Sequence, residues 1–347
     1  MIRVILFILV VVVSCLFFIP WKPTPALKNT KIHGVSLEAP RNPVRTQDLL
    51  PLLDVNTAWV SVIPYAFIDP AEPQVQFHYH QLWWGEGIQG TISTIQMAQE
   101  IGLEVMLKPH VWVRGQGWAG DFNLPTEEQW ELWEDTYREY IMTYARLADS
   151  MDVKLFCIGT EFRQAVKQRP GYWRQLVTQV RSIYTGKITY AANWDNYNNV
   201  TFWPALDFIG IDAYFPLCER KTPTVGSILE GWQPLEPLLK DFSERHGKPI
   251  LFTEYGYKSI DYTAAGHWKH DEDTLLINNE AQTHAYDGLY QAIWDEPWFA
   301  GGFLWKWHLQ DPRWPGKRER NFTPQHKPVI KIIKKRYEKY KNPGENE

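Results

Sequence analysis

Eight short apolar runs recur along the chain, and segments with helical periodicity separate them. The runs cover residues 32–37, 58–64, 104–109, 154–159, 188–193, 208–212, 250–253 and 302–305. Between them, apolar residues lie three and four apart, as at Trp130, Trp133 and Tyr137. Buried strands that alternate with helices form parallel sheets, and eight such units predict a (β/α)8 barrel. An open doubly wound sheet is the alternative, but no glycine-rich phosphate loop follows the first run.

The rest of the chain suggests a single catalytic domain with short extensions. We expect the barrel to cover residues 31–341 of the 347, preceded by a linker at 21–30 and followed by a tail at 342–347. Residues 1–20 form a separate segment, because Arg3 is followed by an apolar run over residues 4–19. Such a run is typical of a secretory signal or a short membrane anchor.

Two interpretations of this N-terminal segment stay open. The string from Val12 to Cys15 fits a lipoprotein signal, which would be cleaved before Cys15 and lipidated there. The apolar residues 16–19 that follow suit an uncleaved anchor better, although the run is slightly short to span a bilayer. In either case we expect the barrel to lie outside the cytoplasm, tethered to the membrane or secreted.

The composition limits the kind of partner. Aromatic residues make up 15% of the chain, including 18 Trp. Some belong to the core, but tryptophan is also the side chain that stacks on the apolar faces of sugar rings. A net charge of −4 argues against nucleic acid as the main partner. Beyond Cys15, only Cys157 and Cys218 remain, too few for a disulfide framework.

Polar and aromatic side chains stand at the ends of most predicted strands. The fourth strand leads to Glu161 and the seventh to Glu254, and barrel active sites are built at these strand ends. Two carboxylates that flank one bond are the minimum requirement for cleaving a glycosidic bond. A single strand-end Glu is more often a salt-bridge partner, but here further candidates for substrate binding surround the pair. They are His110, Trp112, Asn193, Trp194, Asp195, Asp212, Tyr214, Tyr255, Trp305 and Trp307.

Three short strings at the predicted strand ends resemble glycoside hydrolase family 113, a family of retaining barrel glycosidases in clan A. The strings are Ile-Gly-Thr-Glu ending at Glu161, Thr-Glu-Tyr-Gly around Glu254, and Trp305-Lys-Trp307. The resemblance implies a retaining hydrolase of β-1,4-linked mannans, with Glu161 as acid/base and Glu254 as nucleophile. Many clan members have Asn directly before the acid/base, whereas this chain has Thr160. Asn193 is then a candidate for binding the sugar 2-hydroxyl.

The two glutamates must differ in protonation at the same pH. Glu254 must be ionised to attack, and a hydrogen bond from Tyr214 or Tyr255 would favour that form. Glu161 must start protonated, which a neighbouring carboxylate and aromatic walls favour. Trp305 is expected to form the platform under the sugar, with a place in the barrel core as the alternative.

Other classes of function have less support in the sequence. His78 and His80 have the spacing of a metal-binding pair, but no Asp on the last strand accompanies them, so we expect neither a metal nor a cofactor. A glycan-binding barrel without activity would usually lose a carboxylate, and this chain has both. The specific β-glycan, and endo or exo action, stay open. We expect a monomer that binds a polysaccharide or oligosaccharide.

Overall fold

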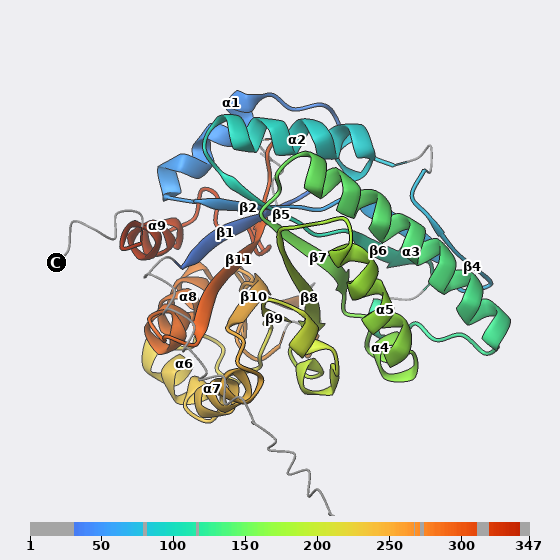
Figure 1. Cartoon of the computed structure of the whole chain (residues 1–347). Helices are drawn as coiled ribbons and strands as arrows, with labels where there is room; N and C mark the ends of the chain where they lie inside the picture. Colours follow the sequence, from blue (N-terminus) through green and yellow to red (C-terminus); the bar gives the residue numbers. More distant parts are fainter. Residues whose placement is uncertain are drawn as a thin grey trace, which may run out of the picture.

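A closed barrel of eight parallel strands forms the centre of the molecule (Figure 1). The computed structural model describes residues 31–78, 82–115, 118–266, 268–270, 274–310 and 319–340. Around the barrel the strand order is β1, β11, β10, β9, β8, β7, β5 and β2, which confirms the predicted (β/α)8 fold. The strands are β1 (Ile32–Leu37), β2 (Trp59–Val62), β5 (Glu104–Leu107), β7 (Leu155–Thr160), β8 (Lys187–Asn193), β9 (Ile209–Asp212), β10 (Ile250–Tyr255) and β11 (Phe299–Trp307).

The last strand differs most from its predicted span. The sequence pattern suggested residues 302–305, whereas β11 covers Phe299–Trp307. Gly301 lies inside the strand with φ +106°, and a Cβ there would come within 2.1 Å of the Ile32 carbonyl oxygen on β1. The glycine therefore permits close approach of two strand backbones rather than ending the strand.

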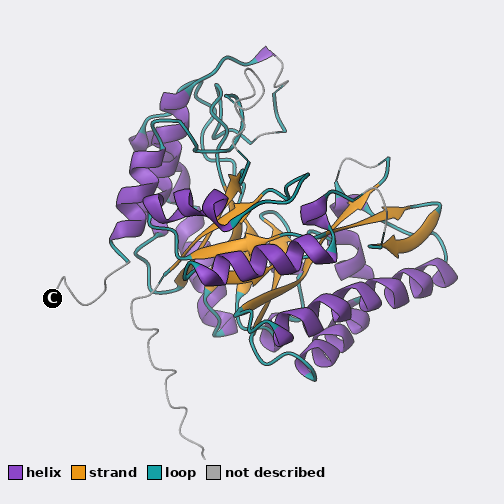
Figure 2. Ribbon diagram, turned by 90° about the horizontal axis from the view of Figure 1, so that it is seen from above, coloured by secondary structure: helices purple, strands orange, loops and turns teal. Residues whose placement is uncertain are grey.

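Helices cover the outside of the barrel (Figure 2). They are α1 (Thr46–Leu49), α2 (Ile88–Glu100), α3 (Glu127–Ser150), α4 (Arg163–Gln168), α5 (Pro170–Arg181), α6 (Val225–Trp232), α7 (Leu235–His246), α8 (Asn279–Ile293) and α9 (Ile330–Glu338). The predicted apolar face of α3 is buried, because Trp133 and Tyr137 are fully enclosed and Tyr137 donates a hydrogen bond to the Ile158 carbonyl of β7. Amphipathic packing thus fixes the helix against the strand that leads to Glu161.

A small second sheet, absent from the sequence prediction, extends one side of the barrel mouth. It contains β3 (Tyr65–Asp69), β4 (Glu72–Gln76) and β6 (His110–Val113) in the order β4, β3, β6. After β2 the chain passes Pro64 and enters β3, and after β5 it passes Pro109 and enters β6. These two rim strands pair with each other, with Tyr65 opposite His110. Proline lacks the N–H that a ladder needs, so it separates barrel strand from rim strand at both places.

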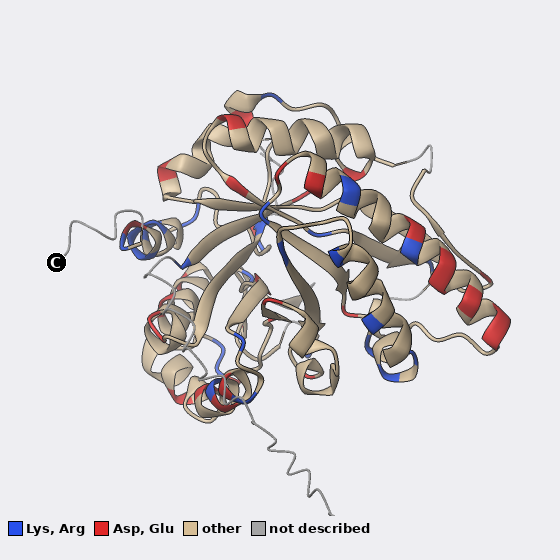
Figure 3. Cartoon of the chain, viewed as in Figure 1, with Lys and Arg blue, Asp and Glu red and all other residues tan. Residues whose placement is uncertain are grey.

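The surface carries both signs of charge. In the view of Figure 3, Lys, Arg, Asp and Glu are interspersed over the outer helices, with acidic residues along α3. Within the part of the chain that the structure describes, no helix is both long enough and apolar enough to cross a membrane.

Candidate active site

A cleft of about 300 Å³ opens at the carboxyl ends of the barrel strands. Both glutamates predicted from the sequence line this cleft. Its other walls are Tyr65, His110, Val111, Trp112, Val113, Trp118, Ala119, Thr160, Tyr214, Trp305 and Phe322. The strand ends and the rim sheet together therefore enclose one space around two carboxylates.

Glu161 follows β7 directly and lies half-buried in the cleft. Its φ is +56°, and its N–H donates to the Ala191 carbonyl of β8 at 2.8 Å. The indole Nε1 of Trp118 donates to Glu161 Oε2 at 2.6 Å. Burial, together with the negative charges of Asp212 and Glu254, raises the pKa of Glu161 to about 8. Glu161 is therefore protonated at neutral pH, as a general acid requires.

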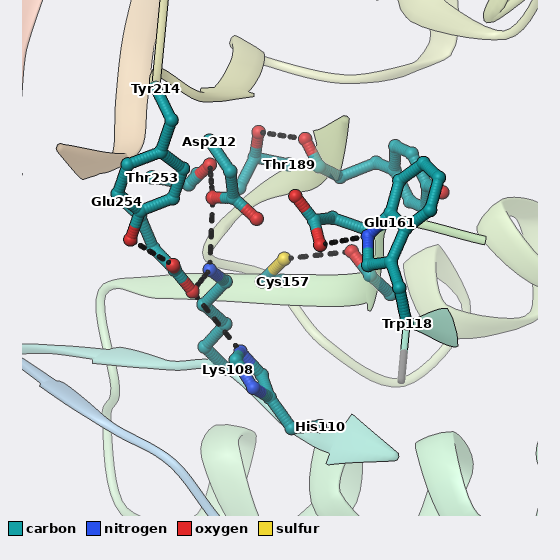
Figure 4. Close-up of polar contacts among 12 residues, drawn as sticks. Lys108, His110, Trp118, Cys157, Glu161, Thr189, Asp212, Tyr214, Thr253 and Glu254 are labelled. Atoms are coloured by element: carbon teal, nitrogen blue, oxygen red, sulfur yellow. Dashed lines mark hydrogen bonds and ion pairs between the residues drawn. The ribbon is translucent and has the colours of Figure 1, made fainter. Parts of the chain in front are cut away.

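Glu254 lies within β10, one residue before its end, rather than beyond the strand as the predicted span of 250–253 implied. Two donors hold its carboxylate: Lys108 Nζ at 2.5 Å from Oε1, and the Tyr214 hydroxyl at 2.8 Å from Oε2. Figure 4 shows this group on one side of the site, with Glu161 and Trp118 on the other. Both hydrogen bonds stabilise negative charge on Glu254, which suits a nucleophile.

Lys108 lies beside Glu254 and Asp212, a place that the sequence pattern did not predict. It is fully buried and also lies 3.0 Å from Asp212 Oδ1. Burial by itself lowers the pKa of Lys108, but the carboxylates of Asp212 and Glu254 outweigh it and raise the pKa above its ordinary value. A lysine that ends a buried strand was the available signal, because burial of an ammonium requires a carboxylate partner.

Aromatic rings flank the carboxylates on the side of the rim sheet. His110 stacks on Trp305 with ring centres 6.1 Å apart, and its Nε2 lies 3.6 Å from Glu254 Oε1. Burial and the nearby charge of Lys108 hold the pKa of His110 well below its usual value, so the ring is neutral. Trp112 is 51% exposed and stacks on Tyr65. Of the predicted substrate-binding residues, four line the cleft, and their contact with sugar stays a prediction: His110, Trp112, Tyr214 and Trp305.

Three predicted substrate contacts need correction. Tyr255 is buried, and its hydroxyl meets those of Tyr290 and Tyr337, because side chains alternate along a strand and Glu254 takes the inward position. Trp307 is buried in the core, since the β1–β11 register shifts after Trp305. Asp212 is buried beneath the cleft as a partner of Lys108.

Three further candidates, at the end of β8, do not line the cleft: Asn193, Trp194 and Asp195. Asn193 donates to Asp195 at 2.8 Å, and Trp194 stacks on the exposed Trp268. Their contact with sugar stays a prediction. Thr160, at the position of the clan's Asn, does line the cleft, and its hydroxyl has no hydrogen-bond partner among the described residues.

Three residues that no sequence pattern marks also line the cleft: Tyr65, Trp118 and Phe322. Trp118 and Phe322 lie outside helices and strands, where no periodic pattern marks a functional residue. Within the described ranges, no group of three His, Cys, Asp or Glu residues could hold a metal ion. Of the His78 and His80 pair, His80 lies outside the described residues.

Comparison with known proteins gives one family. The profile of Glycoside Hydrolase Family 113 matches residues 41–327. A GH113 β-mannanase from Alicyclobacillus acidocaldarius, solved in complex with ManMIm, has a TM-score of 0.76 at 25% identity, over 90% of this chain and 98% of that chain. A complex of a GH113 β-1,4-mannanase gives 0.75 at 25% identity, over 89% and 99%.

A more distant structure shares the fold alone. The β-glucuronidase of Bifidobacterium dentium has a TM-score of 0.56 at 15% identity, over 89% of this chain and 46% of that chain. No match was found among curated proteins. Because the family profile covers most of the barrel, and the solved GH113 enzymes match nearly the whole chain, this chain belongs to glycoside hydrolase family 113.

Proposed function

We propose that the protein is a retaining glycoside hydrolase that cleaves β-1,4-linked mannan or manno-oligosaccharides by double displacement. Glu161 serves as the acid/base and Glu254 as the nucleophile. The observation that carries the proposal is the contrast between the two carboxyl groups in one cleft: Glu161 has a pKa raised to about 8, and Glu254 accepts hydrogen bonds from Lys108 and Tyr214. The β-mannanase activity of the two similar GH113 structures supports mannan as the substrate.

In the first step, a Glu254 oxygen forms a bond to the anomeric carbon while the bond from that carbon to the leaving oxygen breaks. Glu161 gives its proton to the departing oxygen, which leaves as an alcohol. The product is a glycosyl ester of Glu254. Because Glu161 is protonated at neutral pH, the acid is ready before substrate arrives.

In the second step, Glu161 is ionised and accepts a proton from water, whose oxygen attacks the anomeric carbon. The ester bond to Glu254 breaks, and the carboxylate returns to its two donors, Lys108 and Tyr214. Two inversions at one carbon give overall retention.

The walls of the cleft suit a neutral sugar. Trp305 and the exposed ring of Trp112 offer faces on which apolar C–H groups can stack. Asn193 stays our candidate for binding the sugar 2-hydroxyl, because the Thr160 hydroxyl oxygen is buried although Thr160 lines the cleft.

We also propose that the enzyme acts outside the cytoplasm. The support is the apolar run at residues 4–19 after Arg3, with Cys15 as a candidate site of lipidation. Cleavage and lipidation, or retention as an anchor, would each join the barrel to a membrane.

Alanine variants of the two glutamates test the roles with a dinitrophenyl β-mannoside, whose leaving group needs no proton. Glu254→Ala should lose several orders of magnitude in kcat/KM, since no ester can form. Glu161→Ala should lose about 10²–10⁴-fold on mannan but retain its first step on the dinitrophenyl substrate. Azide should then restore turnover of Glu161→Ala and give the β-mannosyl azide, whereas Glu254→Ala should give the α-azide.

Proton NMR of the first product of the unmodified enzyme provides the matching check, with the β-anomer expected. Inverted product, or the same azide anomer from both variants, would overturn the assignment of Glu254 as nucleophile.

A further inference from the structure

Lys108 places a buried positive charge directly beneath the proposed nucleophile. Its side chain, which follows β5, is fully buried, with Nζ 2.5 Å from Glu254 Oε1 and 3.0 Å from Asp212 Oδ1. Figure 4 shows the ammonium between the two carboxylates. One cation is therefore shared by two acids on neighbouring strands.

Asp212 accepts a second hydrogen bond in this group. The Thr253 hydroxyl donates to Asp212 Oδ1 at 2.7 Å, and the backbone N–H of Ala213 donates to the Glu254 carbonyl at 2.7 Å. The second oxygen, Asp212 Oδ2, is buried and has no hydrogen-bond partner in the described part of the chain. A buried carboxylate with so few donors depends on a nearby cation, and Lys108 supplies it.

The charges change places during the proposed reaction. In the resting enzyme Glu161 is protonated and Lys108 is positive. Burial and the charge of Glu254 raise the pKa of Asp212 to about 7, so Asp212 is fully ionised only above neutral pH. When Glu254 becomes an ester it loses its charge, and Glu161, having given its proton away, gains one. Lys108 then has a single carboxylate in contact, that of Asp212.

We infer that Lys108 is the positioning residue for Glu254, and that Asp212 is the counter-ion that keeps the ammonium in place while Glu254 is esterified. The inference rests on the proposed function. Without Lys108, the carboxylates of Asp212 and Glu254 repel each other, and attack on the sugar slows. Without Asp212, Lys108 still contacts Glu254 in the resting enzyme. In the covalent intermediate, however, Lys108 contacts no carboxylate, so the intermediate becomes less stable.

The experiment compares Lys108→Met, Asp212→Asn and the double variant with the unmodified enzyme. Lys108→Met alone leaves buried acids unpaired and is expected to be unstable. The double variant removes the pair together, so its Tm should stay close to that of the unmodified enzyme, while kcat/KM on the dinitrophenyl substrate falls about 100-fold. Thr189→Val is the matched control, because Thr189 is buried in the same barrel but bonds only to backbone carbonyls.

Asp212→Asn is judged by the lifetime of the intermediate. A 2-deoxy-2-fluoro-β-mannosyl fluoride should trap the ester on Glu254, and intact mass spectrometry follows its loss after excess reagent is removed. Because the intermediate of Asp212→Asn is less stable, reactivation should be about tenfold faster than in the unmodified enzyme, while kcat/KM falls by a similar factor. A role confined to folding would change neither rate once the protein is folded.

Two results would overturn the inference. A double variant within threefold of the unmodified kcat/KM would show that Lys108 only balances Asp212. Unchanged reactivation in Asp212→Asn would remove the counter-ion role. The azide products of Glu161→Ala and Glu254→Ala test the proposed function separately. If those products have the expected configurations while either of the two results above is obtained, only the present inference is rejected.

Discussion

At the scale of single residues, the environment of Glu161 determines how activity depends on pH. Only the protonated acid can deliver its proton, so kcat/KM on mannan should fall as the pH rises through about 8. The hydrogen bond from Trp118 acts in the opposite direction to burial, because it stabilises the charged form and lowers the pKa of Glu161.

Trp118→Phe tests this balance. Loss of the indole donor should move the basic limb of the kcat/KM profile up by about one pH unit, since a hydrogen bond to a charged group contributes about 1.5–3 kcal/mol. Trp112→Phe is the control, because Trp112 lines the cleft but stacks on Tyr65. If the limb stayed in place in Trp118→Phe, it would belong to a group other than Glu161.

At the scale of elements, the junction between β5 and β6 aligns the site. The Tyr140 hydroxyl of α3 lies 3.2 Å from the Pro64 carbonyl oxygen and 2.9 Å from that of His110, so one side chain joins both places where the chain passes from barrel to rim sheet. Lys108 and His110 stand on this junction, which links helix packing to the position of the charge beneath Glu254.

Tyr140→Phe should therefore affect stability and catalysis together. We expect a loss of about 1–3 kcal/mol in the free energy of unfolding, because buried carbonyls lose their donor, and a lower kcat/KM. Tyr184→Phe provides the comparison, since its hydroxyl donates to the Val153 carbonyl at the opposite end of the barrel. Urea unfolding measures the effect on stability, and initial rates measure the effect on catalysis. Equal losses of kcat/KM in Tyr140→Phe and Tyr184→Phe would disprove a special role for the junction.

At the scale of the whole molecule, every described barrel strand lies after residue 31. A chain shortened to begin at Lys28 should therefore fold, stay soluble and retain full activity, whereas the chain that keeps residues 1–27 should be found with membranes. A chain that begins at Ala39 lacks β1, which pairs with both β2 and β11, and should not fold. Circular dichroism and cell fractionation provide the measurements; loss of folding on removal of residues 1–27 would contradict the expected boundary.

The order of amino acids by itself determined the barrel and its two glutamates. Alternating runs encode strand and helix locally, and a residue at the end of a parallel strand must lie at one known face. Only the tertiary structure decided that Lys108, from one strand, meets Asp212 and Glu254 from two others, and that Trp118 reaches Glu161 from a loop. Such contacts depend on which strands are neighbours and on side-chain direction, which reverses with each residue, as the outward position of Tyr255 beside Glu254 shows.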